Sequence, residues 1–236
     1  SGEVRTAQPQ PGLLMMGGGD YFPAAFRWLF EHGGHGRLVV LRASGEGELH
    51  SLFMQDIGGI AAVDTIVFSA REAAEDPEVL AIVRAADAIF IAGGDQSNYV
   101  NFWRDTPLED ALNAHVAAGR PLGGTSAGLA IQGAWSYGAL DGGSLLTEQA
   151  LADPMGPGST LVDGFLELAP LAHVITDSHF MPRERLGRLI SWVVRLRQQT
   201  GDAQLIGLGI DEATALAVEG DGSARVLSAA GGKAVA

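Results

Sequence analysis

Short apolar runs alternate with helix-like segments along most of this 236-residue chain, and this alternation constrains the fold more than any other feature. The runs are nearly unbroken, as expected of central strands that are covered on both faces. We expect strands at residues 13–16, 38–41, 65–68, 88–92, 121–123, 173–176, 205–210, 214–218 and 224–227, and helices near 23–32, 77–86, 107–118 and 185–199. Strands that alternate with helices predict right-handed crossovers and a mostly parallel sheet.

The predicted fold class is therefore α/β, a mostly parallel central sheet flanked by helices. The turn signal at residues 219–222 predicts an antiparallel C-terminal edge. Residues 138–164 are rich in Gly, Ser, Asp and Pro and are expected to form a long loop beside the site. We expect residues 1–11 to be a flexible segment and residues 12–236 to form a single domain.

Composition narrows the function classes. The chain has 15 basic and 28 acidic residues, a formal net charge of −13, which argues against nucleic acid or anionic membranes as partners. It has no cysteine, which excludes thiol nucleophiles and thiolate metal sites. No apolar run approaches the roughly 20 residues that span a bilayer. The compartment stays open between the cytoplasm and a secreted or periplasmic location after removal of a signal peptide.

A Gly-x-Ser-x-Gly pentapeptide, Gly124–Gly128, follows the run at 121–123. This spacing is typical of a nucleophile elbow, in which small residues allow a sharp turn from strand into helix. The turn would expose the Ser126 hydroxyl and leave the Ala127 amide free to stabilise an oxyanion. A plain glycine turn between strand and helix is the alternative interpretation.

A second glycine turn, Gly93–Gln96, follows the run at 88–92. Ligands of open parallel sheets lie outside the carboxyl ends of the strands, so this turn and Ser126 should share one edge. The Gly94 amide could then serve the same oxyanion, and the Gln96 side chain could bind a substrate amide or carboxylate. A helix-start turn capped by Asp95 is the alternative.

Six histidines are candidates for the base that would activate Ser126. They are His32, His35, His50, His115, His173 and His179. His115 lies in an amphipathic helix and is expected on the surface. His32 and His35 lie at a glycine-rich helix end, where capping explains them better than a metal without further ligands. His173 opens a strand and is expected to face away from the edge. His179 lies just beyond the carboxyl end of the run at 173–176, within reach of an elbow serine.

Three arginines follow His179 closely: Arg183, Arg185 and Arg188. Positive charge at a helix N-terminus opposes the helix dipole, and such local conflicts often mark functional sites. Guanidinium groups suit carboxylates, either of the chain itself, such as Asp177, or of a substrate. An internal salt-bridge network is the equal alternative.

Together, these motifs resemble peptidase family S51, in its branch of cyanophycinases and cyanophycinase-like exopeptidases. The resemblance runs from the glycines at 17–19 to about residue 228. It is carried by the segments Gly93–Gln96, Gly124–Gly128, Asp177–Phe180 with the three arginines, and Gly209–Glu212. It implies a flavodoxin-like or class I glutamine-amidotransferase-like sheet, no cofactor and no metal, and an acyl-enzyme mechanism in which Ser126 attacks and His179 acts as base and then acid.

The resemblance also implies a substrate, because cyanophycinase cuts a β-linked aspartate–arginine polymer to dipeptides. Positions that match its pocket are Gln96, Asp177, Arg183, Arg185 and Arg188, with Asp177 as the partner of a substrate guanidinium. The triad acid is expected from the loop after the elbow, Asp141 first and Glu148 second. Residues Asp211 and Glu212 are expected to support the edge or to start the next strand. A homodimer is compatible with the family, although no residue requires it.

Three other functions compete. A catalytically silent S51-like protein could retain the pocket only to bind peptides. An α/β-hydrolase esterase would use the same pentapeptide, but the glycine-rich loop at 32–36 precedes a strand and should lie at the wrong sheet edge. A nucleotide-binding protein could use the glycines at 17–19, but Phe22 replaces the third glycine of the dinucleotide pattern and Asp20 would repel phosphate.

Overall fold

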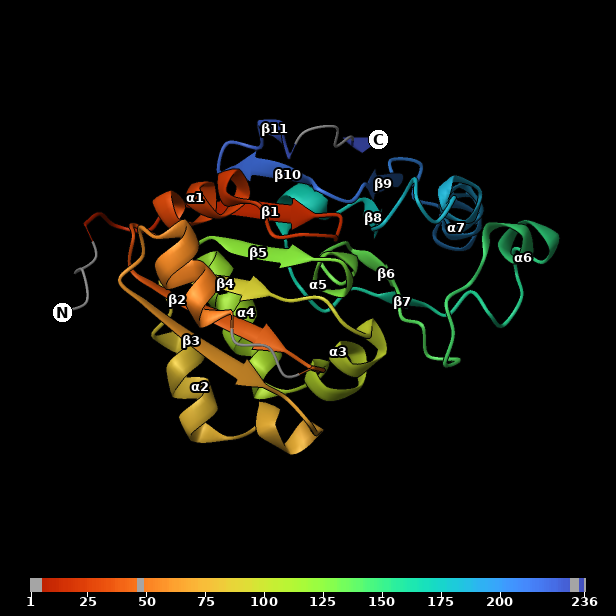
Figure 1. Cartoon of the computed structure of the whole chain (residues 1–236). Coiled ribbons are helices and arrows are strands. Elements are labelled where there is room, and N and C mark those ends of the chain that lie inside the picture. Colours follow the sequence, from red (N-terminus) through yellow and green to blue (C-terminus); the bar gives the residue numbers. More distant parts are fainter. Residues whose placement is uncertain (1–5, 46–48, 230–233, 236) are drawn as a thin grey trace.

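The computed structural model describes residues 6–45, 49–229 and 234–235, which form two sheets joined near the middle of the molecule (Figure 1). The seven-stranded sheet has the order β11-β10-β1-β5-β4-β2-β3, and the five-stranded sheet has the order β12-β9-β8-β6-β7. The strands of the first sheet are β1 Gly12–Met16, β2 Arg37–Arg42, β3 Ala62–Val67, β4 Ala88–Ile91, β5 Leu122–Thr125, β10 Thr214–Glu219 and β11 Ala224–Ser228. Those of the second are β6 Trp135–Tyr137, β7 Leu161–Asp163, β8 Val174–Asp177, β9 Ile206–Ile210 and β12 Ala234–Val235.

Seven α-helices and three other helical turns connect the described strands. The α-helices are α1 Pro23–His32, α2 Pro77–Arg84, α3 Gln96–Trp103, α4 Pro107–Ala117, α5 Ala127–Ala130, α6 Thr147–Ala152 and α7 Leu186–Thr200. The other turns are a π-helical turn at Leu52–Ile57 and 3₁₀ turns at Arg71–Ala74 and Ala169–Leu171.

The predicted fold class is confirmed. Strands β1 to β5 of the first sheet pair in parallel, and β10 and β11 form an antiparallel edge as the turn at 219–222 predicts. Side chains alternate between the two faces of this sheet. In β1, for example, Leu13 and Met15 face one hydrophobic core, and Leu14 and Met16 face the other. Helix α1 covers one face of this sheet, and α2, α3 and α4 cover the other.

The second sheet is the main departure from the expected architecture. The runs at 173–176 and 205–210 belong to it, as β8 and β9, and not to the central sheet. Residues 138–164, expected to be one loop, also contain α6 and β7. These elements are too short, at six and three residues, to show a periodic pattern in the sequence.

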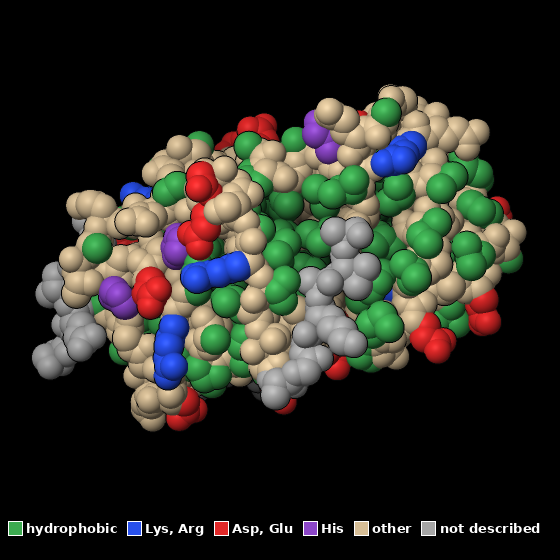
Figure 2. Space-filling view, turned by 90° about the horizontal axis from the view of Figure 1, so that it is seen from above, with side chains coloured by type: hydrophobic (Ala, Val, Ile, Leu, Met, Phe, Trp, Pro, Cys, Tyr) green, Lys and Arg blue, Asp and Glu red, His purple; other side chains and the backbone are tan. Residues whose placement is uncertain are grey.

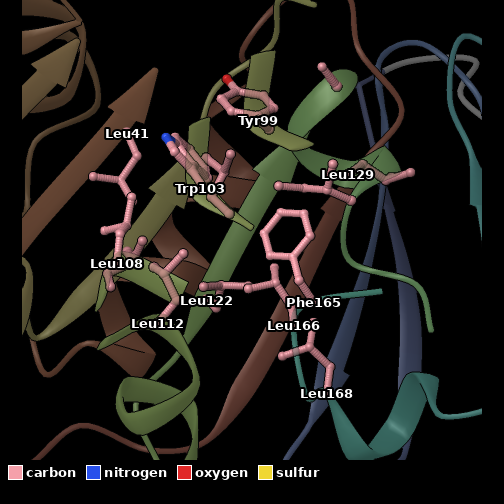
Figure 3. Packing of buried hydrophobic residues seen from close by; sticks show 14 of the residues in the cluster. Leu41, Tyr99, Trp103, Leu108, Leu112, Leu122, Leu129, Phe165, Leu166 and Leu168 are labelled. Atoms are coloured by element: carbon pink, nitrogen blue, oxygen red, sulfur yellow. The ribbon is translucent and has the colours of Figure 1, made fainter. Parts of the chain in front are cut away.

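Helix α5 ties the two sheets together. It begins directly after β5, and the Thr176 hydroxyl of β8 donates hydrogen bonds to the carbonyls of Leu129 and Ala130 at 3.1 and 3.2 Å. Leu129 also packs beside Leu122 and Phe165 in the larger core (Figure 3). The carboxyl ends of β5 and β8 are thereby held next to each other.

Helix α7 carries apolar residues at helical spacing, but this apolar stripe is only partly buried. Leu189 is buried, but Leu186, Ile190 and Val194 remain 53%, 52% and 58% exposed. Figure 2 shows hydrophobic side chains gathered over this end of the molecule. Arg188 takes a core position instead, because its guanidinium pairs with a buried carboxylate at the end of β8.

Residues 1–5 of the predicted flexible segment lie outside the described residues. The amides of Thr6 and Ala7 donate to the carbonyl of Gly34, and that of Gln10 donates to His32. The division of the chain into a flexible segment at 1–11 and a single domain at 12–236 stays a prediction.

Candidate active site

Ser126 lies at a sharp turn between β5 and α5. Its backbone has φ 55° and ψ −114°, a strained conformation for a residue with a side chain. The flanking glycines make the turn feasible: a Cβ on Gly124 would collide with the Gly128 carbonyl, and a Cβ on Gly128 would collide with the Ile91 carbonyl. The geometry is that of a nucleophile elbow.

The imidazole of His179 reaches the same point from the second sheet. His179 follows β8, and its Nε2 lies 2.8 Å from the Ser126 Oγ. The His179 amide donates to the Gly17 carbonyl at 2.6 Å. The His179 ring lies against Gly18, where a Cβ would overlap ring atoms. The glycines after β1 therefore contact His179 and help to position it. This contact explains them better than a phosphate-binding turn does.

The carboxylate that orients His179 is that of Glu212, between β9 and β10. Its Oε1 lies 2.5 Å from the His179 Nδ1. With the Nδ1 proton donated to Glu212, Nε2 is left as the acceptor for the Ser126 hydroxyl.

The expectation that Asp141 or Glu148 would be the triad acid is therefore wrong for this geometry. Asp141 lies across from Gly158, in a neighbouring cavity, and Glu148 is exposed in the first turn of α6. The physical reason is that the chain returns to the edge through β9, so the acid comes from the far end of the sequence.

The surroundings of His179 favour its neutral form. Burial lowers the pKa of His179, the charges of Arg183 and Arg185 lower it further, and the hydrogen bond to Glu212 opposes this shift. A neutral imidazole near neutral pH can accept a proton from Ser126.

The two amides expected to form an oxyanion hole lie at this edge. Gly94, at the end of β4, lines the cavity into which Ser126 opens, and Gly93 lies against the Ser126 side chain. Neither the Gly94 nor the Ala127 amide donates a hydrogen bond to any described residue. Both amides are thus available for a ligand, and their role stays a prediction.

The turn after β4 agrees with both of its interpretations, as a capped start of a helix and as a wall of the active-site cavity. Asp95 caps α3 by accepting a hydrogen bond from the Ser97 amide at 2.9 Å. Gln96 lines the cavity and donates to the Tyr137 carbonyl at 3.3 Å, so it lies where a substrate group would meet it.

Asp177 and two of the predicted arginines form a buried ionic cluster. The Arg188 guanidinium binds both oxygens of Asp177, at 2.6 and 2.7 Å, and the Arg185 Nη1 lies 3.4 Å from Asp177 Oδ1. Arg188 is only 2% exposed and its guanidinium packs on the ring of Trp192. Asp177 and Arg188 thus neutralise each other, as the alternative of an internal salt-bridge network expects. Asp177 also lines the active-site cavity and Arg188 does not, and a role of either residue in substrate binding stays a prediction.

Arg185 and Arg183 line the cavity, and their predicted role in substrate binding stays a prediction. Burial lowers the pKa of Arg185 to about 10, which still leaves its guanidinium charged near neutral pH. Arg183 is exposed, and its side chain has no hydrogen bond or ion pair with the residues that the structure describes. Arg183 is thus the guanidinium most available to an incoming carboxylate.

The cavity itself has a volume of about 310 Å³. Ser126 and His179 open into it beside Gly94, Gln96 and the two arginines. In the described part of the chain, no three His, Asp or Glu side chains are grouped as metal ligands would be. No described helix is both long and apolar enough to cross a bilayer.

None of the other five histidines lines the active-site cavity. His173 pairs with Asp202, and His32 pairs with Glu219. His115, expected on the surface, is buried, and its Nε2 lies 3.0 Å from the Pro121 carbonyl. Burial lowers the pKa of His115 to about 4. The loop at 32–36 precedes β2, at the amino end of the strands and away from Ser126.

Comparison with known proteins agrees with this geometry. The sequence profile of peptidase family S51 matches residues 59–226, which is more than half of the chain. The chain belongs to peptidase family S51. It is 36% identical over 182 residues to a cyanophycinase from Synechococcus elongatus, covering 77% of this chain and 51% of the relative. It is 35% identical over 170 residues to a cyanophycinase from Trichormus variabilis, covering 72% and 51%.

The chain thus spans about half the length of the curated S51 relatives that it matches. A crystal structure of a peptidase from an acI-B1 Actinobacterium has the same fold, with a TM-score of 0.65 at 20% identity over 97% of this chain and 95% of the other. Membership of the S51 family confirms the resemblance stated from the sequence motifs. It disfavours the α/β-hydrolase and nucleotide-binding alternatives.

Proposed function

We propose that this protein is a serine exopeptidase that hydrolyses β-aspartyl-arginine or related aspartyl peptide bonds. The observation that carries the proposal is the chain of hydrogen bonds from Ser126 through His179 to Glu212, at 2.8 and 2.5 Å. A serine, a histidine and a carboxylate in this order are the working parts of acyl transfer by serine hydrolases.

In the proposed reaction, the Ser126 Oγ attacks the scissile carbonyl while the His179 Nε2 takes the hydroxyl proton. The negative charge that develops on the carbonyl oxygen is met by the amides of Gly94 and Ala127. The C–N bond then breaks, His179 returns its proton to the leaving amine, and an ester on Ser126 remains. Water, deprotonated by His179, hydrolyses this ester and regenerates the hydroxyl.

Glu212 accepts the Nδ1–H bond throughout and stabilises the imidazolium that forms on His179. This positions the ring without requiring the carboxylate to take the proton. The role expected of Asp141 thus passes to Glu212.

The charges of the cavity support an acidic group in the substrate. Arg183 is exposed and unpaired within the described residues, and Arg185 lies beside it in the cavity wall. Guanidinium groups bind carboxylates in two-pronged geometry. The relatives named cyanophycinase suggest that this carboxylate belongs to an aspartyl unit.

The test is a panel of amides incubated with the protein and with its Ser126→Ala variant. A β-aspartyl-arginine polymer, a β-aspartyl amide and an α-aspartyl peptide are compared by mass spectrometry of the products. We expect β-aspartyl-arginine to be released from the polymer by the unaltered protein, with a loss of about 10³-fold or more in Ser126→Ala. Binding of the polymer without any release would instead indicate a silent binding protein. A homodimer stays a prediction that light scattering checks.

A further inference from the structure

A second cavity opens beside the active-site cavity. Its volume is about 350 Å³, and it lies between the segment that follows β6 and the segment that follows α6. The two cavities share Gly143 and Ser144 in their walls. A chain bound over Ser126 could therefore extend past this turn into the second cavity.

The shared wall is held firmly in place. The Tyr137 hydroxyl donates to the Gly143 carbonyl at 3.2 Å and accepts from the Leu145 amide at 3.0 Å. The Ser144 Oγ accepts hydrogen bonds from Arg185 and Arg188 at 3.2 and 3.3 Å. The second cavity thus keeps a fixed position relative to the active site.

Acceptor groups without partners line this cavity. The Asp141 carboxylate faces Gly158, the Asp153 carboxylate faces Gly156, and neither has a hydrogen bond or ion pair with a described residue. The residue Ser159 is only 3% exposed, and its hydroxyl has no partner within the described chain. A buried hydroxyl without a partner is costly, which points to a bound polar group.

The arginine that contacts the segment after α6 donates to backbone carbonyls. The Arg195 Nη1 donates to the carbonyls of Pro154 and Gly156 at 3.4 and 3.2 Å. The Gln149 Oε1 accepts from the Leu146 amide, so its carbonyl oxygen is also occupied. The two carboxylates therefore remain free to meet a donor from outside.

We propose that this second cavity, through Asp141 and Asp153, binds the cationic side chain of a substrate unit beyond the one held at Ser126. The proposal rests on the proposed function and names a feature of its substrate. Guanidinium and ammonium groups are donors only, and they match a cavity of carboxylate and hydroxyl oxygens. The arginine-lined first cavity and the carboxylate-lined second cavity would together fit a chain that carries both charges.

The experiment measures peptide binding to the Ser126→Ala protein by calorimetry, with EDTA present so that no divalent metal mediates the contact. The peptide contains two aspartyl-arginine units, and citrulline, which is neutral and of similar shape, replaces arginine in each unit in turn. We expect one of the two replacements to weaken binding about fivefold. This loss should shrink at high salt, because both carboxylates are exposed.

In the Ser126→Ala/Asp141→Asn/Asp153→Asn variant, that replacement should no longer weaken binding. Glu148→Gln, which removes a charge from α6 outside both cavities, is the matched control and should keep the discrimination. The proposal is overturned if neither citrulline peptide binds more weakly, if the loss persists without the two carboxylates, or if the unmodified peptide does not bind. Hydrolysis of a single aspartyl-arginine amide by the protein with Ser126 intact tests the proposed function separately.

Discussion

The elbow that carries Ser126 is shaped by backbone and by glycines, whereas the segment that carries His179 is held by charged side chains. On the serine side, Gly124 and Gly128 leave room for a strained turn, and the Ser126 side chain makes no capping hydrogen bond to α5. On the histidine side, Glu212 binds the ring, and Asp177, two residues before His179 in the chain, forms a buried ion pair with Arg188. Substitutions on the serine side should therefore impair the site by steric crowding, and substitutions on the histidine side should impair it by loss of charge.

The largest effect is expected from Glu212→Gln on the histidine side. The amide cannot stabilise the imidazolium, and it can hold the ring in the wrong tautomer, so kcat should fall by about 10²- to 10⁴-fold. Steady-state hydrolysis of the best substrate from the panel checks this. Glu148→Gln serves as the control, and equal losses in the two variants would contradict the assignment of Glu212.

Asp177→Asn should destabilise the fold more than it alters the chemistry. It leaves the buried Arg188 guanidinium without a counter-charge, and breaking such a pair costs about 3–5 kcal/mol. Urea unfolding followed by circular dichroism measures the loss in the free energy of unfolding. A loss below about 1 kcal/mol would mean that the cluster is not the anchor of the histidine side.

Gly128→Ala tests the serine side in the same way. The added methyl group would meet the Ile91 carbonyl, and overpacking of this kind costs about 1–3 kcal/mol. Because the strain falls on the elbow, we expect activity to fall together with stability. Gly222→Ala, in the turn between β10 and β11, is a comparison substitution at an open glycine outside the cavity, although its positive φ of 84° adds some strain. An elbow that tolerates Gly128→Ala without either loss would contradict the steric account.

The smallest effect is a displacement of the pH profile by Arg183→Gln. The Arg183 charge lowers the pKa of His179, so its removal raises that pKa. The neutral imidazole is the active base, and activity is lost as the pH falls through this pKa. The acid limb of kcat/KM should therefore move to higher pH in Arg183→Gln and stay in place in Arg183→Lys. A move to lower pH would show that Arg183 does not act on His179 by its charge.

The same contrast explains how much could be predicted from the sequence. Ser126 can be predicted from the sequence because a nucleophile elbow needs glycines at fixed local spacing. His179 can be predicted because it directly follows an apolar run. Glu212 lies 33 residues beyond His179, in the Gly209–Glu212 motif of the family resemblance. The motif alone does not show that its carboxylate reaches the ring, because this depends on the return of β9 to the edge.

The burial of a charged side chain is equally hard to predict from the sequence. The sequence leaves the three arginines after His179 open between substrate and an internal salt-bridge network, and Arg188 takes the second role because it pairs with the buried Asp177. Arg188 lies on the buried face of α7, whereas Ile190 and Val194 are exposed. Apolar periodicity cannot anticipate a helix whose buried face includes an ion pair.

The most direct test of the shared edge is labelling with a fluorophosphonate, followed by peptide mapping. Because the Ser126 hydroxyl and the His179 imidazole are in hydrogen-bonding contact, we expect one covalent adduct, on Ser126, formed more slowly as the pH falls and nearly abolished in His179→Ala. An adduct on another residue, or labelling of Ser126 at an undiminished rate in His179→Ala, would contradict the account.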